Sequence, residues 1–211
     1  VPGNRIRLGS LEPRIVTEDF CSRLSALPNL CPQFHLSMQS GCDSVLKRMN
    51  RKYDTARFLQ SVEALRAAFP GCAITTDMIV AFPGETDREF QESLAFIRKC
   101  GFAQMHIFPY SRRPGTVADR MPGQHPNAVK EARSREAIAA AEEMNLAYRR
   151  SLIDSRQPVL FETEEDGFWS GHAPNYVRVF ARGTELHNTI RNVRITGLHG
   201  EGVEGELEEK A

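Results

Sequence analysis

The sequence predicts an α/β protein, a partial (β/α) barrel followed by a small all-β domain. Three observations carry this prediction. Short apolar runs alternate with helical patterns from residue 5 to residue 154. Each of these runs is followed by a loop rich in Gly, Pro and polar residues. From Gln157 onward the pattern changes to short strands separated by glycines, which suggests a small β-barrel or sandwich.

The first part of the chain contains four predicted strand–helix units. The strands are expected at residues 5–10, 33–38, 73–80 and 103–108. Helices are expected to begin at Thr17, at Asp54 or Thr55, and at Thr86, which forms a capping box with Glu89. Four units in series predict parallel pairing, and a closed eight-unit barrel needs roughly 250 residues, so a partial barrel is expected. In such folds the catalytic and binding residues lie at the C-terminal ends of the strands.

The charge of the chain supports two domains, at 1–156 and 157–211. Lys+Arg and Asp+Glu both number 27, and this balance excludes a globally basic nucleic-acid binder. Residues 157–211 hold five basic and ten acidic side chains, so the preceding part has a surplus of five cations. This change of character predicts a boundary near Arg156.

The five cysteines, Cys21, Cys31, Cys42, Cys72 and Cys100, are never closer than ten positions, which excludes zinc or iron–sulfur ligand spacing. No apolar run could span a membrane, so we expect a cytoplasmic protein with reduced thiols. The chain opens at Val1 without an initiator Met, and we expect it to begin inside a larger protein.

Three segments carry candidate chemistry. Pro83–Thr86 leads into a helix N-terminus, which could hold an anion or a purine edge, with Glu85 accepting from ribose or amine donors; an ordinary capped turn is the alternative. Gln39 and Ser40 are neutral polar groups at a strand end. Asp77, within an apolar strand, must be paired or solvated. His35 and His106 have no evident partner and favour a structural role.

Two basic segments are candidate RNA contacts. Lys47, Arg48, Arg51 and Lys52 lie on a helix and its exit, where four cations could follow a phosphate backbone or simply face solvent. Tyr110 stands beside Arg112 and Arg113, a combination that stacks on single-stranded RNA, although a rigid structural loop is the alternative.

Four strings in order resemble the MiaB-like radical S-adenosylmethionine methylthiotransferases that modify tRNA: RIRLGSLEP, HLSMQSGCDSVLKRMNRKY, TTDMIVAFPGET and HIFPYSRRPGT. Residues 157–211 resemble the TRAM domain of that family, a module that grips the tRNA anticodon arm. Leu11-Glu12-Pro13 is similar to the branch that acts on threonylcarbamoyladenosine beside the anticodon.

The resemblance implies an enzyme that adds a methylthio group to C2 of the modified adenosine, using S-adenosylmethionine, two 4Fe-4S clusters, a sulfur donor and an electron donor. In the family, one cluster sits on a Cys-x-x-x-Cys-x-x-Cys loop, which is absent here, and the other in an absent N-terminal domain. This chain therefore resembles the last four strand–helix units of the barrel plus TRAM, without cluster ligands, and is expected to be inactive alone.

The resemblance also assigns site residues. Around the cofactor it implies Ser10, Glu12, Gln39, Ser40, Asp77, Ile79, Ala81, Pro83, Gly84, Phe108 and Tyr110. Ala81 departs from the glycine that the family usually has, and its methyl group could crowd the adenine. In the TRAM-like part, Arg178, Arg191 and Arg194 are the expected RNA contacts, with Arg182 a further candidate, while Trp169 and Tyr176 could stack bases or belong to the core.

Two other functions stay open on the sequence. One is an RNA-binding fragment or module without catalysis, which predicts salt-dependent tRNA binding. The other is a partial-barrel enzyme that binds a phosphorylated metabolite at Pro83–Thr86, which predicts nucleotide or sugar-phosphate binding and no tRNA affinity.

Overall fold

The computed structural model of the chain describes residues 4–208, so residues 1–3 and 209–211 at the ends of the two predicted domains lie outside it. The described chain forms two compact units. The α/β unit comprises residues 8–28 and 34–145, and the β-barrel unit comprises residues 4–7, 29–33 and 146–208. Each unit is described by itself below.

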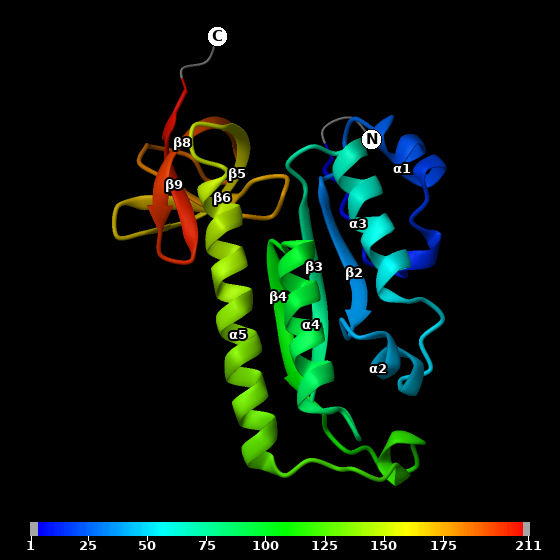
Figure 1. Cartoon of the computed structure of the whole chain (residues 1–211). Helices are drawn as coiled ribbons and strands as arrows, with labels where there is room; N and C mark the ends of the chain where they lie inside the picture. Colours follow the sequence, from blue (N-terminus) through cyan, green and yellow to red (C-terminus); the bar gives the residue numbers. More distant parts are fainter. Residues whose placement is uncertain (1–3, 209–211) are drawn as a thin grey trace. The chain divides into compact units, whose positions relative to one another are not determined.

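A four-stranded sheet forms the centre of the α/β unit, in the order β1-β2-β3-β4. Figure 1 labels its three longer strands, β2, β3 and β4. The strands are β1 (Ser10–Leu11), β2 (Gln33–Gln39), β3 (Ala73–Val80) and β4 (Gln104–Pro109). Pairing is parallel between β1 and β2 and between β3 and β4, as the strand–helix series predicts. The α/β class and its parallel sheet are thus confirmed.

The predicted strand at 5–10 is wrong in its extent. Only Ser10 and Leu11 pair with β2, at His35 and Leu36. Ile6 makes an isolated bridge to Leu30 and belongs to the β-barrel unit. The alternating pattern did not reveal this division, because both halves of the run are extended and only the distant partner differs.

The helices begin where local capping places them. They are α1 (Glu18–Ser25), α2 (Asp43–Arg48), α3 (Thr55–Ala68), α4 (Asp87–Cys100) and α5 (Asn127–Arg150), with short 3-10 turns η1 (Pro13–Ile15) and η2 (Ala118–Arg120). Thr17 caps α1, Asp54 caps α3, and Thr86 with Glu89 forms the predicted capping box of α4. Gly101, in the left-handed region at φ 63°, ends α4.

The two faces of the sheet differ in burial, and this difference positions the site. One face packs under helices, and its core includes Phe34, Leu36, Phe58, Leu65, Met78, Leu94 and Ile97. On the opposite face the alternate residues of β2, β3 and β4 keep part of their surface open: His35, Ser37, Gln39, Asp77, Ile79, His106 and Phe108. In the predicted partial barrel, this second face would be the interior.

Five strands close the β-barrel unit in the order β5-β6-β7-β9-β8. They are β5 (Arg156–Glu165), β6 (Phe168–His172), β7 (Arg178–Ala181), β8 (Ile190–His199) and β9 (Gly202–Leu207), as the glycine spacing predicts. Valines and Phe161 fill the interior, and Trp169 packs against this core. Gly171 is required by a close strand approach, because a Cβ there would lie 1.9 Å from the Leu160 carbonyl oxygen.

A short N-terminal segment completes the β-barrel unit. The Arg5 guanidinium donates to the carbonyl oxygens of His172, at 3.0 Å, and of Pro158. Arg7 lies over the Tyr176 ring at 3.8 Å, and that ring stacks on His172. Among residues 4–208, no helix combines the length and apolar character that a membrane crossing demands.

Candidate functional site

The candidate site lies where β2 and β3 end. Two residues at these ends, Gln39 and Ala81, adopt left-handed backbone conformations, at φ 69° and φ 57°. Neither is a glycine, so each position carries backbone strain of about 1–2 kcal/mol. Strained positions of this kind concentrate at functional sites. The left-handed backbone at Ala81 gives a physical reason why glycine would suit this position.

The β3–α4 loop, residues 81–86, is held by its own glutamate. A Glu85 carboxylate oxygen accepts a hydrogen bond from the Ala81 amide at 2.7 Å and another from Arg133 of α5 at 2.8 Å. Glu85 is only 1% exposed, and burial raises the pKa of its carboxyl above the ordinary value. The expectation that Glu85 accepts from ribose or amine donors is therefore wrong, because its carboxylate faces inward.

The N-terminus of α4 is closed by protein groups. The Thr86 hydroxyl accepts from the Glu89 amide, and a Glu89 carboxylate oxygen accepts from the Thr86 amide at 2.8 Å. Asp87 adds a second carboxylate to the first turn. These negative charges disfavour a bound phosphate, so the capped turn describes this segment better than the anion site does.

Four of the predicted cofactor residues share the open face of the sheet. Ile79 pairs with Phe108 and Asp77 with His106 in the register of β3 and β4. Phe108 is 51% exposed, and Gln39 is half-buried at the end of β2. The side-chain amide of Gln39 makes no hydrogen bond with any residue in the described range 4–208. Together they present apolar surface beside a free amide.

The other predicted cofactor residues lie differently. Ser10 is exposed on β1. Glu12 forms an ion pair with Arg14 at 2.6 Å, and the hydrogen bond from Arg14 lowers the pKa of the Glu12 carboxyl. Ser40 is fully buried, and its hydroxyl contacts Ser93 and the Cys42 amide, so it shapes the β2–α2 loop. Within the β3–α4 loop, Pro83 is buried and Gly84 is exposed.

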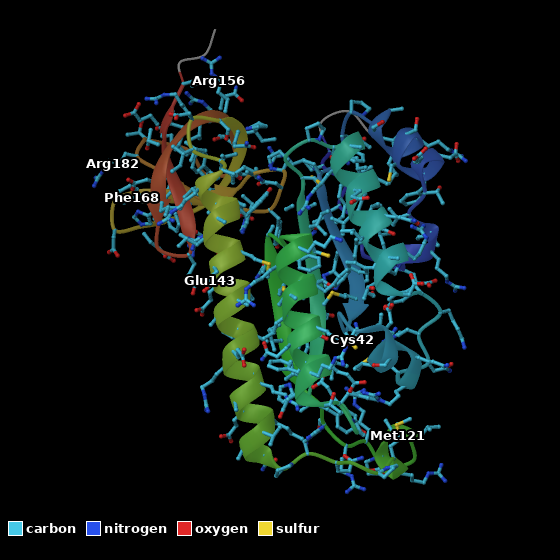
Figure 2. All side chains as sticks on the ribbon, viewed as in Figure 1. Cys42, Met121, Glu143, Arg156, Phe168 and Arg182 are labelled. Atoms are coloured by element: carbon cyan, nitrogen blue, oxygen red, sulfur yellow. The ribbon has the colours of Figure 1, made fainter. Side chains whose placement is uncertain are left out.

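Tyr110 is buried in an apolar cluster and does not stack outward. The cluster consists of Cys42, Val45, Phe82 and Tyr110, with Met49, Ile79, Ala118 and Met121 packed against it; Figure 2 labels Cys42 and Met121. The ring of Tyr110 meets that of Phe82 edge-on, with centroids 5.3 Å apart. Its hydroxyl is buried and finds no partner among the described residues. The expected RNA-stacking role for this tyrosine would need the cluster to open.

A group of three polar side chains on β2 and β3, centred on His35, was not predicted from the sequence. His35 Nδ1 lies 3.0 Å from Thr75 Oγ1, and its Nε2 lies 3.4 Å from an Asp77 carboxylate oxygen. Asp77 is thus paired, as its setting within a strand required. The signal was present in the sequence, since His35 and Asp77 both alternate with apolar residues on adjacent strands.

The predicted RNA-binding cations differ in availability. In the α/β unit, Arg48 is engaged by Glu89 and Arg112 by Asp119, whereas Lys47, Arg51, Lys52 and Arg113 are exposed. In the β-barrel unit, Arg194 pairs with Glu206 at 2.6 Å, Arg191 is half-buried, and Arg178 lies 3.7 Å from Glu165. The number of cationic residues in the sequence is therefore larger than the number of cations that are free to contact phosphate.

An aromatic and cationic cluster marks one surface of the β-barrel unit. His199 lies between Phe168 and Phe180, with ring centroids 5.0 and 4.4 Å away. Arg182 covers the Phe168 ring at 4.3 Å, and Arg178 covers Phe180 at 4.8 Å; Figure 2 labels Phe168 and Arg182. Sequence reasoning named the two arginines and missed the three rings, which come from three different strands.

The residues of this chain do not fit an iron–sulfur cluster. All five cysteines are free and buried. Burial raises the pKa of Cys72 to about 11 and that of Cys100 to about 12. Within residues 4–208, no group of three or more His, Cys, Asp or Glu side chains could hold a metal ion.

Comparison with known proteins shows which proteins this chain is similar to. Residues 2–97 match the radical SAM superfamily. The threonylcarbamoyladenosine tRNA methylthiotransferase MtaB of Thermotoga maritima is 41% identical over 205 residues, which cover 96% of this chain and 47% of that protein. The chain is similar to about half of this tRNA methylthiotransferase. A tRNA-2-methylthio-N(6)-dimethylallyladenosine synthase of Nocardia farcinica is 46% identical over 156 residues, 74% of this chain and 31% of that synthase.

Comparison with solved structures shows a similar fold. Coproporphyrinogen III oxidase of Escherichia coli, a radical SAM enzyme, superimposes with a TM-score of 0.56 at 15% identity. The superposition covers 81% of this chain and 46% of that enzyme. The chain spans about half the length of the methylthiotransferases that match nearly all of it, at 47% and 50%.

Proposed function

We propose that the protein to which this chain belongs adds a methylthio group to C2 of threonylcarbamoyladenosine beside the tRNA anticodon. The observation that carries the proposal is the extent of similarity. Relatives named for threonylcarbamoyladenosine match 96% and 98% of the chain, through both units, whereas two relatives named for dimethylallyladenosine match 74% and 76%. Leu11-Glu12-Pro13, at β1, supports the same branch.

Within this function, the ends of β2 and β3 would hold one side of S-adenosylmethionine. The free side-chain amide of Gln39 can orient the polar groups of the cofactor. Ile79 and Phe108 offer apolar surface to its adenine ring. The backbone of Ala81 to Gly84 would lie along the adenine edge. The bound cofactor supplies the radical that starts the reaction. The two 4Fe-4S clusters need ligands that this chain lacks, so we expect no turnover by the chain alone.

The domain assignment follows from the same proposal. Residues 1–156 would form the last four strand–helix units of a radical SAM barrel, and residues 157–211 a TRAM-like domain that binds the tRNA anticodon arm. The closed five-stranded barrel and its ring-and-arginine surface support an RNA-binding domain. A sulfur donor and an electron donor complete the partners, in the cytoplasm.

The direct test uses the full-length protein, reconstituted anaerobically with iron, sulfide and S-adenosylmethionine. Incubated with tRNA that carries threonylcarbamoyladenosine, it should convert that nucleoside to its methylthio derivative, as mass spectrometry of digested tRNA would show. Unchanged nucleosides would refute the proposal. Under the same conditions the 211-residue chain should acquire no 4Fe-4S absorbance, and stoichiometric iron would contradict the missing ligand set.

A second function is supported by a separate observation. The arginine-covered rings of Phe168 and Phe180 favour an RNA-binding module, which could act without catalysis. It predicts that the chain alone shifts tRNA in a gel and releases it as salt rises. The phosphorylated-metabolite alternative has no comparable support, since the carboxylates of Glu89 and Asp87 occupy the N-terminus of α4.

A further inference from the structure

We propose that Arg133, on α5, is a positioning residue that holds the β3–α4 loop in the conformation that receives the adenine of S-adenosylmethionine. The inference deepens the proposed function and rests on it. Arg133 was not among the residues that the sequence indicated. It acts through Glu85 and Ala81.

The first step of the argument is the backbone of Ala81. Its φ of 57° is unfavourable for an alanine, so something must stabilise this conformation. The Ala81 amide donates to Glu85 Oε2 at 2.7 Å, and Ala81 is fully buried. The carboxylate of Glu85 therefore fixes the direction in which the chain leaves β3.

The second step is what fixes Glu85. Arg133 Nη1 donates to the Glu85 carboxylate at 2.8 Å and to the Glu85 carbonyl oxygen at 3.0 Å. The side chains are 7% and 0% exposed, so water cannot replace either partner. Arg133 Nη2 also donates to Asp87 at 2.7 Å. One guanidinium thus holds both the loop and the first turn of α4.

The third step is that packing between helices does not require this arrangement. Two buried charges are costly to desolvate, and apolar side chains could join α5 to α4 more cheaply. On the same pair of helices, Arg98 and Glu143 make a solvent-exposed pair at 3.9 Å, and Gln91 bonds Glu136. Only the Arg133 bonds, of these three links, reach the strained loop.

The test compares Arg133→Gln with Arg98→Gln, which breaks another α4–α5 link without touching the loop. In the 211-residue chain, hydrogen exchange should accelerate at the Ala81 amide in Arg133→Gln and stay unchanged in Arg98→Gln. In the full-length enzyme, Arg133→Gln should raise the Kd and KM for S-adenosylmethionine about tenfold. The KM for tRNA should not change. Arg133→Lys should recover part of the affinity.

A second variant separates positioning from general stability. Ala81→Gly removes the backbone strain at this position, so the loop no longer needs the Arg133 and Glu85 hydrogen bonds to hold its conformation. In the Arg133→Gln background, Ala81→Gly should therefore restore S-adenosylmethionine binding even if the melting temperature stays low. Unchanged S-adenosylmethionine affinity in Arg133→Gln would overturn the proposal, as would equal rises in both KM values or no rescue. If the wild-type enzyme binds S-adenosylmethionine but leaves tRNA unmodified, the proposed function fails while the binding comparison still decides the role of Arg133.

Discussion

Arg48 on α2 and Glu89 on α4 are joined by two parallel hydrogen bonds, both 2.8 Å long. Glu89 also caps its own helix through the Thr86 amide. One carboxylate therefore links the turn after β3 to the helix after β2. Arg48, which its neighbours in sequence made a candidate RNA contact, is committed to this link.

The Arg48–Glu89 pair makes stability depend on acid. Hydrogen bonds from Arg48 hold the pKa of Glu89 well below its ordinary value of 4.5. Folding therefore gains from the ionised carboxylate above pH 4.5, and this gain shrinks as the pH falls from 4.5 toward the lower pKa that Glu89 has in the folded protein. We expect Glu89→Gln to lower the free energy of unfolding by about 1–2 kcal/mol at pH 7, and by less at pH 3. Urea unfolding at both pH values measures this, with exposed Glu131→Gln as the control.

A methyl group at Gly171 should disrupt the β-barrel unit. The added Cβ would lie 1.9 Å from the Leu160 carbonyl oxygen, and backbone cannot yield as a side chain can. Gly171→Ala should cost about 3 kcal/mol or more. Gly197→Ala is the matched control, since its nearest atom is a Glu204 side-chain atom 3.6 Å away. The fluorescence of Trp169, the only tryptophan, reports unfolding of this unit. Equal midpoints for the two variants would contradict the close strand approach.

All five thiols should be unreactive toward thiol reagents in the native chain. They are buried, and burial raises the pKa of Cys72 to about 11, so little thiolate forms at pH 8. A thiol reagent should label five groups in denaturant and almost none before unfolding. A single rapidly labelled cysteine in the native state would show that its surroundings open locally.

The arginine-covered rings should contribute more to tRNA binding than the ion-paired arginines do. Arg182→Ala and Phe168→Ala remove a cation and a stacking surface, so each should weaken binding by about 1 kcal/mol or more. Arg194→Ala should have a smaller effect, because Glu206 already neutralises that guanidinium. Gel shifts at two salt concentrations measure all three variants. A larger loss in Arg194→Ala would place the RNA on β8.

Local signals predicted most of the fold. The Thr86–Glu89 box, the cap at Asp54 and the alternation in β2 and β3 all depend on neighbours a few residues apart. Features that depend on distant partners were missed. The sequence did not predict that Glu85 is buried, because its partner Arg133 lies 48 residues away, nor that His35 is paired, because Thr75 lies 40 residues away. The same limit applies to the first strand, whose earlier residues pair elsewhere.

The bonds of Arg5 to the carbonyls of His172 and Pro158 limit how the chain can be divided. The β-barrel unit combines residues 4–7 and 29–33 with residues from 146 onward, so its parts are far apart in the gene. Recombination that transferred only the last segment would leave backbone acceptors without their donor. The C-terminal segment therefore does not form the whole unit. Exchanging the β-barrel unit between relatives should give a folded protein only when residues 4–7 and 29–33 are exchanged together with the C-terminal segment.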